Sequence, residues 1–213
     1  MRINKILGVD VEARGPNFFL HGLVSVGLCL VDAATGNVDW KRRISIKPAD
    51  FGRGMQTFEE DCRQQFWSRH EEKLQEFEQE AVSASEAARM IHECMLAAVA
   101  AAADKLVVVS DYKDFDLAQI NNLLEYCDYP SFRFYPTDSS RLMPTIDTDS
   151  YQSALQDGAL FPSDKETLIK IKAPLTTTLA HHDHYPENDA QHIAEMYWLV
   201  HRVRVSVLAA EID

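Results

Sequence analysis

Three strand-like segments occupy the first fifty residues and constrain the fold more than any other feature of the sequence. Lys5 to Val11 and Leu23 to Val31 are mostly apolar runs, and Trp40 to Ile46 ends with apolar residues alternating with polar ones. The segment from Asp32 to Asn37, between the last two, is rich in turn-forming residues and predicts an antiparallel hairpin. The chain is therefore expected to begin with antiparallel sheet.

The remainder of the chain alternates helical and strand-like patterns. The expected elements are a helical pattern from Thr57 to Phe77, a helix capped by Ser83, a buried strand at Leu106 to Val109, a helix at Phe115 to Tyr126, a short strand at Phe132 to Tyr135 and a long helix from Asn188 to Ile212. A hairpin followed by alternating helices and strands predicts an α/β fold, with a mixed sheet covered by helices. Because no linker-like segment interrupts the pattern, residues 1–213 are expected to form a single domain.

The chain is acidic, with 21 Lys and Arg against 33 Asp and Glu and a formal net charge of −12. This excess argues against a protein that coats nucleic acid or an anionic membrane through a broad basic surface, because its overall field repels both. It leaves open a partner that is held at one local site.

The features that report on location favour an intracellular, cytoplasmic protein. The N-terminus lacks the charged and apolar segments of a signal peptide, and the most apolar stretch is too short to span a bilayer. The four cysteines form no CxxC pair, which favours reduced thiols over a disulfide framework or a cysteine-built zinc site. No membrane partner is therefore expected.

Asp10 and Glu12, at the end of the first expected strand, are the first candidate functional pair. Residues two apart in a strand point to the same face, so the two carboxylates lie side by side while Val9 and Val11 point into the core. Neighbouring carboxylates repel each other, and a hard divalent cation such as Mg²⁺ would neutralise that repulsion. A solvated strand end without a ligand is the alternative.

Asp116 is a second candidate, directly after Phe115 at the start of a helix that follows a buried strand. In α/β folds, ligands bind where the chain crosses from the sheet to a helix. The alternative is an ordinary carboxylate at the positive end of the helix dipole, with Asp111 or Asp114 as the helix cap.

His184 and Asp189 form the third candidate pair. Asp189 opens the long terminal helix, and His184 lies in the preceding loop, where it is free to approach the same place. The nearby His181 and His182 leave two other interpretations open, namely a transition-metal site and a solvated loop.

Taken in chain order, these residues resemble the DEDD-type 3′–5′ exonucleases of the ribonuclease H-like superfamily, in the subgroup with a histidine (DEDDh). The motifs that carry the resemblance are Asp10-x-Glu12, Phe115-Asp116, Asp147-Thr148 and His184-x-Pro-x-x-Asp189. The resemblance implies a mixed five-stranded sheet, in which an antiparallel meander of the first three strands is followed by parallel strands, flanked by helices. The chain departs from the family at Ala13 and Arg14, where Thr-Thr is common, and at Tyr112, where many members have Asn.

The resemblance further implies hydrolysis of phosphodiester bonds from the 3′ end of single-stranded nucleic acid by a two-metal-ion mechanism, with Mg²⁺ or Mn²⁺ as cofactor. Asp10 would bridge the two ions, and Asp116 would support one of them. Glu12 and Asp189 would hold the ion that activates water, and His184 would act as general base. RNA is the favoured substrate. A DNA-directed exonuclease in proofreading or repair and a non-catalytic nucleic-acid-binding module are the alternatives.

Candidate substrate contacts follow from the need to hold a single-stranded end. Phe18 and Phe19, with Leu20, could wedge against the terminal bases, or they could simply anchor the loop in the core. Arg14, next to Ala13, could reach a phosphate or a ribose. Trp67 is a further candidate for stacking, although a position in the core explains it as well. Dimerisation is common among the resembled relatives, so a homodimer is an open expectation.

Overall fold

The computed structural model describes residues 3–17, 20–47, 57–103, 105–131, 145–147 and 183–210. Within these ranges the order of elements is β1 (Lys5–Ala13), β2 (Leu23–Asp32), β3 (Val38–Ser45), α1 (Glu60–Gln65), the short 3₁₀ helix η2 (Trp67–Arg69), α2 (Glu71–Glu80), α3 (Ala84–Ala102), β4 (Leu106–Ser110), α4 (Lys113–Tyr126), β5 (Thr145–Asp147) and α7 (Pro186–Ala210). The expected strand at 132–135 lies outside the described residues, as do Phe18, Phe19, Thr148, His181 and His182.

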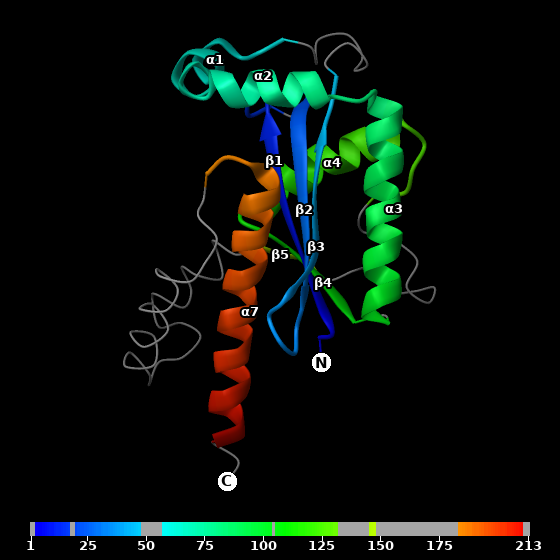
Figure 1. Ribbon diagram of the computed structural model, residues 1–213, viewed down its shortest axis with the longest axis vertical. Helices are drawn as coiled ribbons and strands as arrows, with labels where there is room; N and C mark the ends of the chain where they lie inside the picture. Colours follow the sequence, from blue (N-terminus) through cyan, green and yellow to red (C-terminus); the bar gives the residue numbers. More distant parts are fainter. Residues whose placement is uncertain are drawn as a thin grey trace.

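The strands form one mixed sheet in the order β3-β2-β1-β4-β5 (Figure 1). β1 pairs antiparallel with β2, and β2 with β3, whereas β4 runs parallel to β1 and β5 runs parallel to β4. The turn of the β2–β3 hairpin is closed by the Asp32 carboxylate, which accepts hydrogen bonds from the backbone N–H groups of Ala34 and Thr35. The expected α/β fold, with a mixed sheet flanked by helices, is confirmed.

Helices cover both faces of the sheet. α7 lies against one face, and α3 and α4 cover the other (Figure 1). Leu7, Val9 and Val11 of β1 are buried on the side of α3 and α4, whereas Ile6 is buried on the side of α7. β1 is therefore buried on both faces, and the alternation of its side chains places Asp10 on the side of α7.

Two glycines bring the start of α7 directly onto the sheet. A Cβ atom at Gly8 would lie 1.9 Å from the carbonyl oxygen of Ala190, and one at Gly27 would lie 1.9 Å from the carbonyl carbon of Pro186. Both distances are far too short for a non-bonded contact, so only glycine lets the backbone of α7 approach β1 and β2 this closely. Asp189 lies between the two contacts along α7 and is thereby held close to the central strands.

The helical pattern expected from Thr57 to Phe77 is wrong in one respect, because the structure divides it into α1, η2 and α2. At the division, the indole N–H of Trp67 donates a hydrogen bond to the backbone carbonyl of Ala13 at 3.0 Å. Trp67 and Phe77 pack with Val24 of β2 in a small core separate from the two main ones. Long-range contacts of this kind override the local helical periodicity.

Two helix starts test the capping predictions. Ser83 caps α3 as expected, and its hydroxyl accepts a hydrogen bond from the backbone N–H of Glu86. The N-cap of α4 is Tyr112, which makes no capping hydrogen bond through its side chain. The prediction that Asp111 or Asp114 caps this helix is therefore wrong. The Asp111 carboxylate lies near other carboxylates instead.

All four cysteines are free, namely Cys29, Cys62, Cys94 and Cys127. Among the helices of the described ranges, none is both long and apolar enough to cross a membrane.

Candidate active site

The five residues predicted to carry chemistry come from three separate parts of the chain and meet where β1 ends and α4 and α7 begin. Asp10 and Glu12 lie in the second half of β1, Asp116 in the first turn of α4, His184 just before α7 and Asp189 in the first turn of α7. All four carboxylates are buried, whereas the histidine side chain is one-third exposed, at 33%. These residues form two groups of possible metal ligands.

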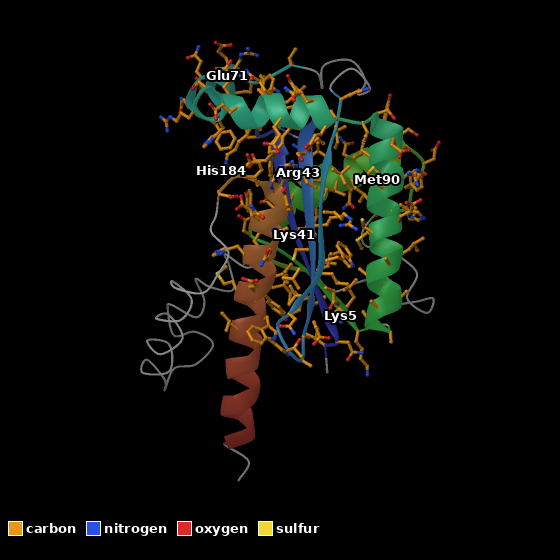
Figure 2. The ribbon with its side chains drawn as sticks, in the orientation of Figure 1. Lys5, Lys41, Arg43, Glu71, Met90 and His184 are labelled. Atoms are coloured by element: carbon orange, nitrogen blue, oxygen red, sulfur yellow. The ribbon has the colours of Figure 1, made fainter. Side chains whose placement is uncertain are left out.

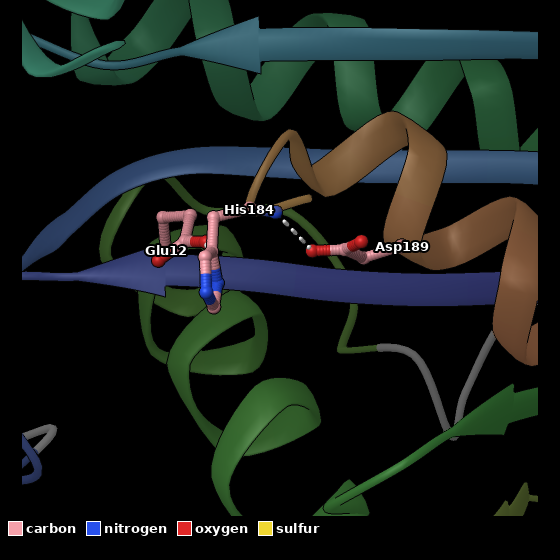
Figure 3. Close-up of side chains that lie close together, drawn as sticks. All are labelled: Glu12, His184 and Asp189. Carbon is pink, nitrogen blue, oxygen red and sulfur yellow. Dashed lines mark hydrogen bonds and ion pairs between the residues drawn. The ribbon is translucent and has the colours of Figure 1, made fainter. Parts of the chain in front are cut away.

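Glu12, His184 and Asp189 make up the first group, called here the histidine group. One ligand atom from each residue lies within 4.8 Å of those of the other two. The Nδ1 atom of His184 is 3.7 Å from the Glu12 carboxylate. Figure 3 shows the hydrogen bond from the backbone N–H of His184 to Asp189, at 3.0 Å. The second oxygen of Asp189 accepts from the backbone N–H of Asp183 at 2.9 Å, so the fold itself orients this carboxylate.

His184 has a left-handed backbone conformation, with φ of 59°. Residues other than glycine adopt this conformation rarely, and it persists only where surrounding contacts enforce it. The two backbone hydrogen bonds to Asp189 are among those contacts. The unusual backbone therefore belongs to the arrangement that brings His184 to the Glu12 carboxylate.

Asp10, Asp111 and Asp116 make up the second group, called here the aspartate group. Again, one ligand oxygen from each residue lies within 4.8 Å of the others. The Ser110 hydroxyl donates a hydrogen bond to Asp116. Because Asp10 and Glu12 are neighbours on one face of β1, the two groups adjoin each other along this strand.

Asp111 is the member of this site that the sequence did not identify as a ligand. It was considered only as a helix cap, yet it follows β4, whose residues are all buried, at its carboxyl end. Polar residues just beyond the carboxyl ends of parallel strands line the ligand crevice of α/β sheets. That position is the signal that could have identified Asp111 before the structure was known.

The carboxylates of the site destabilise one another's ionised forms. Burial raises the pKa of Asp10 well above its ordinary value, and the charges of Glu12 and Asp116 add to the effect. Burial likewise raises the pKa of Glu12, with Asp189 as the largest charged contributor. Burial raises the pKa of Asp116 to about 8, and the charge of Asp111 contributes further. A positively charged ligand would remove this repulsion.

The chemistry of the donor atoms fits divalent cations. Each group offers three side chains that could hold an ion, and five of the six side chains are carboxylates. Hard cations prefer carboxylate oxygen, and an imidazole is tolerated by several divalent metals. Buried acidic groups that repel one another are also what a cation site requires, because the ion's charge offsets the cost of burying them.

Two of the expected substrate contacts are corrected by the structure. Trp67 is only 2% exposed, so it belongs to the core and offers no ring face for a base to stack on. Arg14 is only 3% exposed; its guanidinium lies 4.4 Å from the Phe58 ring and 3.9 Å from Glu78, and so does not face solvent. The physical reason in both cases is that residues 57–80 pack against the ends of β1 and β2. Ala13 lies at the end of β1, and its contact with substrate stays a prediction.

No family model matches the chain, and no curated protein matches its sequence. Solved structures do match. The nuclease domain of 3′hExo, a DEDDh family member, bound to rAMP is 13% identical over 94% of this chain and 93% of that domain, with a TM-score of 0.60. E. coli exonuclease I in a zinc-bound complex with single-stranded DNA is 16% identical, with a TM-score of 0.63. Cell-death related nuclease 4 is 12% identical, with a TM-score of 0.58.

The share of each protein that is covered differs among these matches. The match to exonuclease I covers 98% of this chain but only 43% of the exonuclease I chain. The match to cell-death related nuclease 4 covers 94% of this chain and 64% of that protein. At these identities the likeness establishes the fold, which is that of DEDD-type 3′–5′ exonuclease domains.

Proposed function

We propose that this protein is a metal-dependent 3′–5′ exonuclease that hydrolyses single-stranded nucleic acid, with RNA favoured over DNA. The observation that carries the proposal is the pair of adjoining ligand groups, which share strand β1 and contain every residue of the DEDDh pattern. A fold alone does not imply an activity, so the argument rests on these side chains and their positions. The likeness to the 3′hExo nuclease domain covers nearly the whole chain, which favours one exonuclease domain over residues 1–213.

The two groups are suited to hold two divalent ions, Mg²⁺ or Mn²⁺. Glu12 and Asp189 would hold one ion, and Asp116 together with Asp111 would hold the other. Asp10 would face both, because it belongs to the aspartate group and neighbours Glu12 on the same face of β1. Two such ions stabilise both the attacking and the leaving oxygen of an in-line displacement.

His184 would act as the general base. Its ring is partly exposed, so a water molecule can reach it, and its Nδ1 atom faces the Glu12 carboxylate at 3.7 Å. The ordinary pKa of histidine is near neutrality, which suits an imidazole to accept a proton from the attacking water. The hydrogen bonds of Asp189 to the backbone N–H groups of Asp183 and His184 would hold the backbone of His184 in place during the reaction.

The substrate proposal is a single-stranded 3′ end bound at a local site. The matched structures include one bound to rAMP and one in complex with single-stranded DNA, so their ligands are compatible with either a ribose or a deoxyribose substrate. The net charge of −12 disfavours extended contact with the phosphate backbone. We therefore expect short contacts near the terminal nucleotide, which depend on the bound cations for attraction.

The decisive experiment digests matched single-stranded RNA and DNA oligomers, labelled at the 5′ end, with Mg²⁺ or Mn²⁺. A ladder that shortens stepwise from the 3′ end is expected, faster for RNA, and it should vanish with EDTA. Circular single-stranded substrates serve as the control, because an exonuclease leaves them intact. The proposal fails if no linear oligomer is degraded with either ion, or if the circles are cut. Faster digestion of DNA would select the DNA-directed alternative.

A further inference from the structure

The segment from Phe66 to Glu76 contacts each of three consecutive residues, Asp183, His184 and Tyr185. This segment comprises η2 and the first half of α2. Figure 2 shows His184 below the start of α2, which carries Glu71. None of these contacts is a hydrogen bond or a ring contact with a carboxylate of the two ligand groups, although the charge of Lys73 partly offsets the rise that burial causes in the pKa of Glu12.

Two aromatic side chains pack against the ring of His184. The Phe66 ring lies edge-on to it, with centroids 5.0 Å apart and planes 88° apart. The His70 ring lies closer still, with centroids 4.6 Å apart and a tilt of 56°. Phe66 and His70 also contact each other, at 4.8 Å. The three rings therefore form one cluster in which each ring restricts the other two.

Polar contacts from α2 hold the residues on either side of His184. Lys73 donates a hydrogen bond to the backbone carbonyl of Asp183, and its ammonium lies 4.2 Å from the centroid of the Tyr185 ring. The Tyr185 hydroxyl donates to Glu76 at 2.9 Å. Arg43 of β3 in turn binds Glu76 at 2.5 Å, which ties this arrangement to the sheet.

The geometry of His184 explains why such support is needed. Its backbone is in the left-handed region, and its side chain is one-third exposed. Asp189 fixes the backbone N–H of His184 but does not fix the ring. A catalytic group that is displaced by about 1 Å can lose on the order of 10²-fold in rate. The orientation of the imidazole therefore depends on the rings packed against it.

We propose that His70 is a positioning residue, which together with Phe66 holds the His184 imidazole against the Glu12 carboxylate. The proposal rests on the proposed function for the role of His184. His70 acts through packing, and among the described residues it belongs to neither ligand group. Substrate and metal binding should therefore be independent of it.

The activity test compares His70→Ala with His70→Phe. We expect His70→Ala to lower kcat about tenfold, with KM and the Mn²⁺ concentration for half-maximal activity unchanged. His70→Phe keeps an aromatic ring beside His184 and should restore most of kcat. His92→Ala is the matched control, because His92 packs against a tyrosine ring, that of Tyr129, at 4.9 Å on the distant α3 helix. This variant should behave like the wild type.

A second measurement needs no nuclease activity. In proton NMR spectra of the metal-free protein, the ring Hε1 resonance of His184, assigned by its loss in His184→Ala, should move in His70→Ala and stay put in His92→Ala. An unchanged resonance or an unchanged kcat in His70→Ala overturns the proposal, as does failure of His70→Phe to restore activity. An inactive wild type with the expected resonance shift would refute the proposed function and leave the packing inference standing.

Discussion

The histidine group holds two carboxylates and an imidazole, the aspartate group holds three carboxylates, and the fold supports the two groups differently. In the histidine group, two backbone N–H groups donate to the two oxygens of Asp189, and an imidazole faces Glu12. In the aspartate group, Asp116 accepts a hydrogen bond from the Ser110 hydroxyl, but the Asp111 carboxylate also lies beside it. In the histidine group, Asp189 is stabilised by two backbone donors, whereas in the aspartate group Asp116 has one hydroxyl donor and is repelled by Asp111.

The difference shows how the protein tolerates so many buried acids. Because burial and the charge of Asp111 raise the pKa of Asp116 to about 8, this carboxyl group retains a proton at neutral pH when no cation is bound. A cation entering the aspartate group must displace that proton, whereas Asp189 is already oriented by hydrogen bonds. We therefore expect metal binding at the aspartate group to strengthen as the pH rises toward about 8.

The largest expected effect is that of Asp10→Asn, which changes the residue that adjoins both groups. Loss of this carboxylate should reduce exonuclease activity by about 10⁴-fold, because both ions lose a shared ligand. The metal-free fold should remain intact or become more stable, since one of the mutually repelling buried acids is removed. Digestion of a labelled oligomer and the melting temperature Tm measure the two quantities.

The matched control is Asp39→Asn. Asp39 also lies in a strand, β3, but it pairs with Lys5 at 2.7 Å and not with the site. Full activity of Asp10→Asn would contradict the assignment, as would an equal loss of activity in Asp39→Asn.

Replacing the base should separate catalysis from metal binding. His184→Gln is expected to reduce kcat by about 10²-fold, the lower range for loss of a general base. Binding of Mn²⁺ at the aspartate group should be unchanged in isothermal titration calorimetry, because none of its three carboxylates is altered. Loss of all Mn²⁺ binding in His184→Gln would show that the two groups are not separable.

Asp111→Asn tests the ligand that was recognised only in the structure. The amide keeps an oxygen but loses the charge, so we expect about a tenfold higher Mn²⁺ concentration for half-maximal activity, with a smaller change in kcat. Asp114→Asn is the control, because Asp114 is an exposed residue in the first turn of α4, just after Asp111 in the sequence. Equal behaviour of the two variants would remove Asp111 from the site.

The pH dependence of stability is the smallest effect and the most direct test of the comparison. A carboxyl group whose pKa is raised in the folded protein stabilises the fold fully below its ordinary pKa of 3.8, and this contribution is lost as the pH rises toward about 8. In EDTA, the Tm should therefore fall between pH 5 and pH 8, by about 2–4 °C for each kcal/mol lost. Saturating Mn²⁺ should reduce the fall, and so should Asp116→Asn. A Tm that rises over this range would contradict the assignment.

Several features of the site could be predicted from local pattern. The spacing of Asp10 and Glu12 within an apolar run predicts that both lie on one face of a strand, and in the structure both lie two residues apart in β1. The position of Asp116 in the first turn of α4 follows from the helical periodicity after a buried strand. The start of the terminal helix follows from its pattern to within a few residues, which places Asp189 correctly.

Other features required the tertiary structure, because they depend on groups that are distant in the sequence. Asp111 joins the site because Asp10 of β1 lies beside it, and Trp67 is a core residue because it packs with Val24 and Phe77. The burial of Arg14 beneath Phe58 likewise depends on how the α1–α2 segment folds back over β1. No periodicity within one segment encodes such distances.

The sequence by itself determined most of the elements and the faces on which the acids lie, since both follow from the two short-range periods of strand and helix. Only the tertiary structure decided how closely the elements approach one another. Gly8 allows α7 to touch β1, which brings Asp189 to Glu12, and the packing of η2 and α2 brings His70 to His184. The reason is physical: a catalytic site depends on distances between elements, and packing across the core sets those distances.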